Sequence, residues 1–102
     1  MQLISAIEVF NNKTDYYIID IREKYEYDFA NVGSKHIPMD EVCSRLDEFP
    51  KDKIIILMCK SGKRASALCN LLYIDFELVN VKVLDGGIEA YKEIVAPHLM
   101  LE

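Results

Sequence analysis

The residues best suited to chemistry gather around Cys59, which follows an apolar run at positions 53–58. After it come a polar loop and the start of a helical pattern: Lys60, Ser61, Gly62, Lys63, Arg64 and Ala65. A sulfur placed here faces the unpaired amide N–H groups of a helix N-terminus, which stabilise an anion together with the cations of the loop. Gly62 lets the backbone curl, Ser61 can donate a hydroxyl hydrogen bond, and Arg64 can neutralise an incoming anion. The pattern predicts a populated thiolate that acts as a nucleophile.

A plainer interpretation is that Cys59 is a small apolar residue closing a strand, and the physical pattern alone leaves both open. Cys43 and Cys69 lie on apolar faces of predicted helices without nearby cations, so both are interpreted as core residues. His36 and His98 have no spacing that links them to Cys59, so they are interpreted as surface or packing histidines. Three cysteines without a CxxC pair indicate neither a disulfide framework nor a metal site, and a reducing cytoplasm fits this pattern.

The elements that would hold the loop alternate between strands and helices. Strands are predicted at 16–19, 53–58 and 81–84, with a short extended segment at 36–38. Helices are predicted at 5–10 with Ser5 as its cap, at 22–28, at 40–49 with Asp40 as its cap, from 65 onward, and at 88–95.

This alternation favours an α/β fold in which a mainly parallel central sheet is flanked by helices. Ligands of such sheets bind beyond the carboxyl ends of the strands. The polar clusters at 20–23, 59–64 and 85–87 fall at such ends, so we expect parts of them to meet at one rim. Asp85 is interpreted first as a turn former.

The composition limits the classes of protein to consider. A chain of 102 residues fits a single domain over 1–102, although Leu101 and Glu102 are either native or a remnant of an expression vector. No apolar run approaches the roughly 20 residues that cross a bilayer, which disfavours membrane insertion. A net charge of −5 disfavours nucleic-acid binding. We expect a cytoplasmic monomer.

The segment 59–65 resembles the active-site loop of rhodanese-like sulfurtransferases, C-[RK]-[ST]-G-x-R-[AS]. The segment 20–26 is similar to the family's D-x-R-E-x-x-E-[YF] pattern, 33–38 to G-[AS]-x-N-I-P, and 85–91 to G-G-[IF]-x-x-W. Two departures are visible: Phe29-Ala30-Asn31 stands where many members carry Gly-His-Ile, and Tyr91 replaces Trp. The resemblance implies a three-layer rhodanese-like domain.

The resemblance also implies a reaction. Cys59 would attack the outer sulfur of thiosulfate or a related anionic donor, hold it as a persulfide, and pass it to cyanide, a small thiol or a protein acceptor. Lys60 to Ala65 would form an amide cradle, and Lys63 and Arg64 would assist anion binding. No cofactor is implied. Arg22 is expected to be structural, pairing with Asp20 or another acid of the rim, with a direct substrate role as the alternative.

Other functions remain open at this point. Cysteine phosphatases use a similar loop for phosphate, but they need Cys-x5-Arg, whereas four residues separate Cys59 from Arg64. An arsenate reductase sharing the fold is a weaker possibility. A module of another class would receive sulfur from a partner, or sense oxidants through Cys59, without catalysing transfer.

Overall fold

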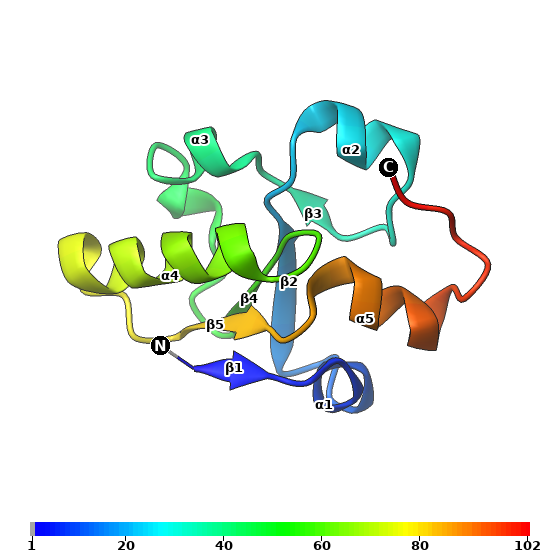
Figure 1. The fold of residues 1–102 in the computed structure, drawn as a ribbon. Coiled ribbons are helices and arrows are strands. Elements are labelled where there is room, and N and C mark those ends of the chain that lie inside the picture. Colours follow the sequence, from blue (N-terminus) through cyan, green and yellow to red (C-terminus); the bar gives the residue numbers. More distant parts are fainter. Residues whose placement is uncertain (1) are drawn as a thin grey trace.

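A five-stranded parallel sheet divides the molecule into two helical layers in a computed structural model that describes residues 2–102 (Figure 1). The strands lie in the order β1-β5-β4-β2-β3 and comprise β1 (Leu3–Ile4), β2 (Tyr16–Asp20), β3 (Lys35–His36), β4 (Ile54–Met58) and β5 (Val81–Leu84). The helices are α1 (Ala6–Asn11), α2 (Lys24–Phe29), α3 (Met39–Val42), a 3₁₀ turn η1 (Leu46–Glu48), α4 (Lys63–Phe76) and α5 (Gly87–Val95). The predicted α/β architecture is confirmed.

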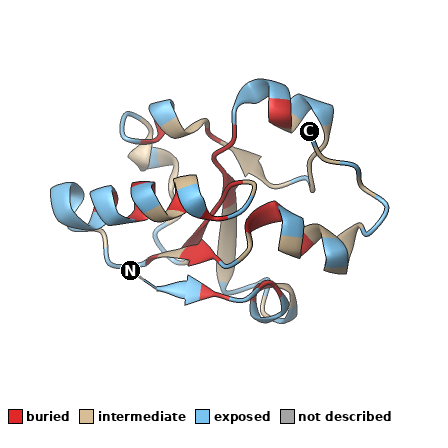
Figure 2. Ribbon diagram, viewed as in Figure 1, coloured by how far each residue is buried: buried red, intermediate tan, exposed pale blue. Residues whose placement is uncertain are grey.

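The central strand β4 shows why the sheet has a core on both faces. Ile55 and Leu57 belong to the cluster that α3 and α4 cover, whereas Ile56 and Met58 belong to the cluster that α1 and α5 cover. All four residues are fully buried. Figure 2 shows buried residues in red in the sheet between the helical layers. Burial of each contributes roughly 2 kcal/mol, which explains the near-continuous apolar run of this strand.

The predicted helix at 40–49 is wrong. The chain instead forms the short α3, whose N-cap is Pro38 rather than Asp40, and then turns into η1. Because the helix ends after Val42, the helical spacing no longer directs Cys43 toward the sheet, and its side chain is exposed. The prediction that Cys43 is a core residue is therefore also wrong. Arg45 stabilises the turn by pairing with both Glu41 and Glu48.

Two other boundaries differ from the prediction. The helix expected from residue 22 begins at Lys24, and Arg22 is buried below it rather than exposed on it. The strand β1 was not predicted, because its two residues, Leu3 and Ile4, are too few to show a periodicity. Within residues 2–102, no helix is both long enough and apolar enough to cross a membrane.

Candidate active site

Cys59 lies directly after β4, beneath the loop that leads into α4. Its sulfur accepts hydrogen bonds from the backbone N–H of Gly62 at 3.1 Å and of Ala65 at 3.4 Å. The residue is only 1% exposed. These contacts bring the sulfur to amide groups at the start of a 14-residue helix, where the helix dipole favours negative charge.

Gly62 makes this curl possible because its φ is 108°, a left-handed value that residues with a Cβ avoid. A Cβ built there would meet only ordinary contacts, 3.6 Å from the Leu84 carbonyl oxygen and 3.8 Å from the Gly86 nitrogen. The backbone angle, rather than the available space, therefore requires glycine at this position.

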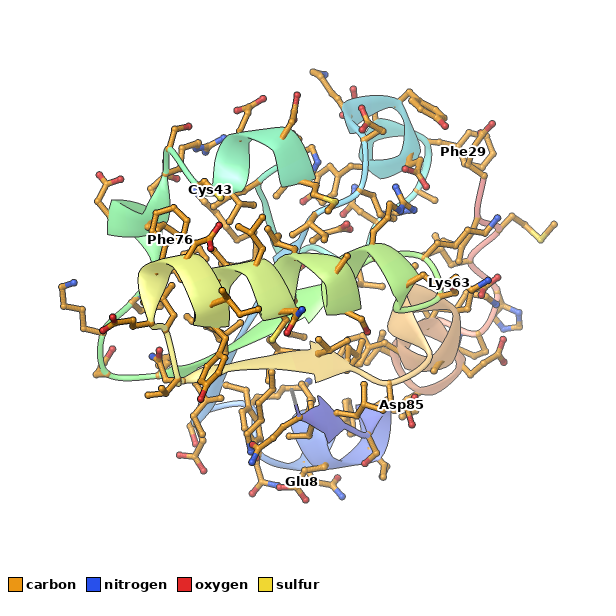
Figure 3. The ribbon with its side chains drawn as sticks, turned by 60° about the vertical axis from the view of Figure 1, so that its left-hand side comes forward. Glu8, Phe29, Cys43, Lys63, Phe76 and Asp85 are labelled. Atoms are coloured by element: carbon orange, nitrogen blue, oxygen red, sulfur yellow. The ribbon has the colours of Figure 1, made fainter. Side chains whose placement is uncertain are left out.

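The turn between β5 and α5 supports the loop from below. The N–H of Ile88 donates to the carbonyl oxygen of Cys59 at 2.8 Å, and that of Glu89 donates to the carbonyl oxygen of Lys60 at 3.2 Å. A Cβ on Gly87 would collide with both carbonyl oxygens, so this glycine permits the close approach. Asp85 is exposed at the end of β5, and Figure 3 shows it at the same edge of the molecule as Lys63.

Asp20 and Arg22 form a buried ion pair at the end of β2. The Arg22 guanidinium donates from Nη2 to Asp20 at 2.8 Å and from Nε to both carboxylate oxygens. It also donates to the carbonyl oxygens of Glu26 and Ala30, which belong to α2 and its C-terminal cap. Buried charges need such partners. This network joins the end of β2 to α2 and engages the Arg22 guanidinium with partners inside the protein.

Glu26 holds the loop arginine. Its carboxylate accepts from Nη1 of Arg64 at 2.7 Å and from Nη2 at 3.0 Å, and it also accepts from the N–H of Glu23 at 3.0 Å. The hydrogen bonds from Arg64 hold the pKa of Glu26 below its ordinary value, even though burial opposes this shift. The same bonds raise the pKa of Arg64. Glu26 was not among the predicted site residues. The sequence does contain a signal for Glu26: it is an acidic residue in the first turn of a helix that starts at the same rim as the loop carrying Arg64.

The two lysines of the loop are arranged differently. Lys63 is exposed, and Figure 3 shows it projecting from the start of α4. The Nζ of Lys60 donates to the carbonyl oxygen of Glu102 at 2.8 Å. Ser61, Gly62 and Lys63 line an open hollow of about 410 Å³ beside the turn that follows β5. Of the predicted loop residues, Gly62 and Ala65 contact the Cys59 sulfur, whereas Lys60 and Arg64 bind Glu102 and Glu26.

Among the described contacts, none joins the sulfur of Cys59 to the other cysteines or to the histidines. Cys69 is buried, as predicted, and burial raises the pKa of its thiol. His36 stacks on Tyr27 with ring centroids 4.4 Å apart, and its Nε2 lies 2.8 Å from the carbonyl oxygen of Arg22. His98 is exposed. In the described part of the chain, no group of three or more His, Cys, Asp or Glu side chains is placed to hold a metal ion.

Comparison with known proteins identifies the family of this chain. The family model for the Rhodanese-like domain matches residues 5–94. The chain belongs to the rhodanese-like family. The predicted resemblance to this family is thereby confirmed.

Relatives from Bacillus subtilis connect the family to sulfur transfer. The protein named Putative sulfurtransferase YtwF is 32% identical over 85 residues, which cover 79% of this chain and 78% of that protein. Putative sulfur carrier protein YrkF is 37% identical over 65 residues, which cover 59% of this chain. The match spans only 35% of YrkF, so this rhodanese-like domain corresponds to about a third of that longer protein.

Solved structures support the fold. A rhodanese-related protein from Thermoplasma volcanium superposes with a TM-score of 0.79, at 25% identity and with complete coverage of both chains. Together with the B. subtilis relatives, this match supports a general role in sulfur transfer for the domain.

Proposed function

We propose that this rhodanese-like domain is a sulfurtransferase that moves sulfane sulfur from thiosulfate or a related donor through a persulfide on Cys59. The observation that carries the proposal is the pair of amide hydrogen bonds to the Cys59 sulfur, from Gly62 and Ala65. Fixed amide dipoles stabilise a thiolate before the reaction and can hold the negative outer sulfur after it.

The proposed cycle has two displacements. The Cys59 thiolate attacks the outer sulfur of thiosulfate, the sulfur–sulfur bond of the donor breaks, and sulfite leaves with the bonding electrons. The enzyme then carries a persulfide anion. An acceptor, either cyanide or a thiolate, attacks the terminal sulfur, and the Cys59 thiolate leaves. The products are thiocyanate or a new persulfide, and the cycle balances without a redox cofactor.

The loop supplies binding and orientation in this proposal. The backbone of Lys60, Ser61, Gly62 and Ala65 surrounds the reacting sulfurs, and the Ser61 hydroxyl can donate to an anionic donor. Lys63 is exposed at the start of α4 and can attract anions, while Arg64 lies beside Cys59 in its pairing with Glu26. Asp20 and Arg22 fix the neighbouring strand end.

The proposal also includes the oligomeric state, the cellular compartment and the sulfur acceptor of this domain. We propose a cytoplasmic monomer, since free thiols persist in a reducing compartment. A protein thiol is a suitable acceptor, because a persulfide transfers its terminal sulfur to any thiolate that can reach it. The absence of a CxxC pair fits a single-cysteine relay on Cys59.

A non-catalytic relay module is the second candidate. It is favoured by the relative named as a sulfur carrier, of which this domain covers only 35%. In that case Cys59 would accept sulfur only from a protein partner and would turn over thiosulfate poorly.

The experiment that separates these candidates is a steady-state assay of thiocyanate formation from thiosulfate and cyanide. We expect turnover by the wild type and by Cys43→Ser, which removes an exposed thiol outside the loop, and none by Cys59→Ser. If the folded wild-type protein formed no thiocyanate above the Cys59→Ser background, small-donor sulfurtransferase activity would be rejected in favour of the relay.

A further inference from the structure

The charge at the loop is smaller than the sequence of the loop indicates. Lys60, Lys63 and Arg64 contribute three cations. The structure adds two acids from the start of α2, because Glu26 binds Arg64 directly and Glu23 lies close enough to raise the pKa of Arg64 as well. Glu26 and Glu23 precede Arg64 by 38 and 41 positions, so the sequence of the loop alone does not reveal them.

Glu26 cannot easily release Arg64. Its side chain is 8% exposed, and its carboxylate is also fixed by the N–H of Glu23. The backbone around it is tied to the buried Arg22, which donates to the Glu26 carbonyl oxygen. Moving Arg64 toward a substrate would leave a buried carboxylate without its charge partner, which is strongly unfavourable. An anionic donor therefore meets an arginine whose charge is already offset.

We propose that Glu26 is a positioning residue that determines which sulfur donors the enzyme prefers, according to their charge. By holding Arg64 and offsetting its charge, Glu26 favours monoanionic sulfane-sulfur donors, such as thiosulfonates, over the dianion thiosulfate. This inference rests on the proposed sulfurtransferase function. Lys60 and Lys63 remain to attract a single negative charge, while the second charge of thiosulfate is repelled by the acids of α2.

The reaction with such a donor balances in the same way as with thiosulfate. The Cys59 thiolate attacks the outer sulfur of methanethiosulfonate, the sulfur–sulfur bond breaks, and methanesulfinate leaves with the electron pair. One persulfide anion and one sulfinate anion replace one thiolate and one thiosulfonate anion. The two donors transfer the same atom and differ by one unit of charge. Their different leaving groups affect every variant alike, so a change in the ratio of the two rates between variants reports the electrostatic contribution.

The test compares kcat/KM for methanethiosulfonate and thiosulfate, with cyanide as the acceptor, in the wild type and in Glu26→Gln. Glutamine keeps the size of the side chain and one acceptor for Arg64 but removes the charge. In Glu26→Gln we expect the ratio of the two kcat/KM values to shift toward thiosulfate by about tenfold, because one charge is removed near a partly screened site. The shift should arise mainly from a lower KM for thiosulfate. High salt should reduce the shift.

A matched control is available in the second bidentate arginine–glutamate pair of the chain. Glu48 binds Arg45 at 2.6 and 3.0 Å in the turn before β4 and also pairs with Lys35 at 3.0 Å. No hydrogen bond or ion pair of the described residues joins Glu48 or Arg45 to the loop at 59–65. Glu48→Gln should leave the donor ratio unchanged. If the ratio of kcat/KM values in Glu26→Gln equalled that in Glu48→Gln, the proposal would be overturned, even if both rates fell. A purely structural role of Glu26 would lower kcat/KM for both donors by the same factor.

A further variant covers the case in which Glu26→Gln does not fold. Glu23 is exposed, and Glu23→Gln should shift the ratio in the same direction by a smaller factor. An unchanged ratio in that variant would then overturn the proposal. Failure of the proposed function itself looks different, because the wild type would form no Cys59-dependent thiocyanate from either donor.

Discussion

Cys59 and Cys69 are both buried, but their sulfurs face opposite kinds of backbone group. The Cys59 sulfur accepts hydrogen bonds from two amide N–H groups. The Cys69 thiol instead lies 3.6 Å from the carbonyl oxygen of Val81, to which it donates, and burial raises its pKa. Burial alone thus produces an inert thiol, and amide donors at a helix start distinguish a site suited to an anionic sulfur.

Removing each sulfur in turn is the strongest test of this difference between Cys59 and Cys69. We expect Cys59→Ala to lower sulfur transfer by at least ~100-fold, since it removes the proposed nucleophile. Cys69→Ala should leave sulfur transfer within about twofold and should instead lower the free energy of unfolding by ~1 kcal/mol, because it leaves a small cavity in the core. Thiocyanate assays and urea unfolding measure the two effects. Equal loss of activity in both variants would contradict the comparison.

The exposed Cys43 extends the comparison to reactivity. With iodoacetamide at pH 8, Cys43 should be alkylated roughly 100-fold faster than Cys69, since Cys69 is both buried and raised in pKa. Peptide mass spectrometry over time measures the two rates. Comparable rates in the native protein would show that Cys69 is accessible, and would contradict its placement in the core.

Gly62 tests whether the amide curl matters for the Cys59 sulfur. Gly62→Ala imposes a Cβ at a φ of 108°, so we expect a loss of roughly 1–2 kcal/mol in stability. If the loop relaxes, its amide moves away from the sulfur, and sulfur transfer should fall by about tenfold.

Gly33→Ala is the matched control for this strain. Gly33 has a φ of 80°, and no atom, including those of the loop at 59–65, lies within 4 Å of a built Cβ. The Gly33→Ala variant should also lose stability, because its Cβ strains a left-handed backbone angle, but its sulfur transfer should be unchanged. If both variants lost activity in proportion to their stability, the amide curl would have no specific role.

The smallest expected effect concerns the ion pair beside Cys59. The pKa of Glu26 is lowered in the folded protein from its ordinary 4.5, so its carboxylate stabilises the fold above that pH. This contribution is lost as the pH falls below 4.5 toward the folded-state value. Glu26→Gln should therefore reduce the change in melting temperature between pH 6 and pH 3 by a few degrees. An identical pH dependence in the variant and the wild type would contradict the assigned shift.

The sequence was informative where local patterns determine structure. The apolar run before Cys59 predicted β4, and the glycine of the loop predicted a backbone curl that the left-handed angle of Gly62 now explains. The prediction failed at Cys43, because helical spacing continued through a point where the backbone leaves the helix. A periodic pattern cannot show where a helix stops without a clear cap signal.

The site also contains a long-range feature that local patterns could not supply. Arg64 was predicted to neutralise an incoming anion, and the structure adds that Glu26, 38 positions earlier in the sequence, pairs with it. Only the tertiary fold, which places the first turns of α2 and α4 at the same end of the sheet, brings these groups together. The roles of the individual loop residues in binding a donor remain predictions.

The most direct test of the central claim is the mass of the intact protein after incubation with thiosulfate, followed by cyanide. The account predicts that the wild type gains one sulfur atom, that Cys59→Ser gains none, and that cyanide removes the added sulfur as thiocyanate. A folded wild-type protein that gains no sulfur, or a Cys59→Ser variant that gains as much as the wild type, would contradict it.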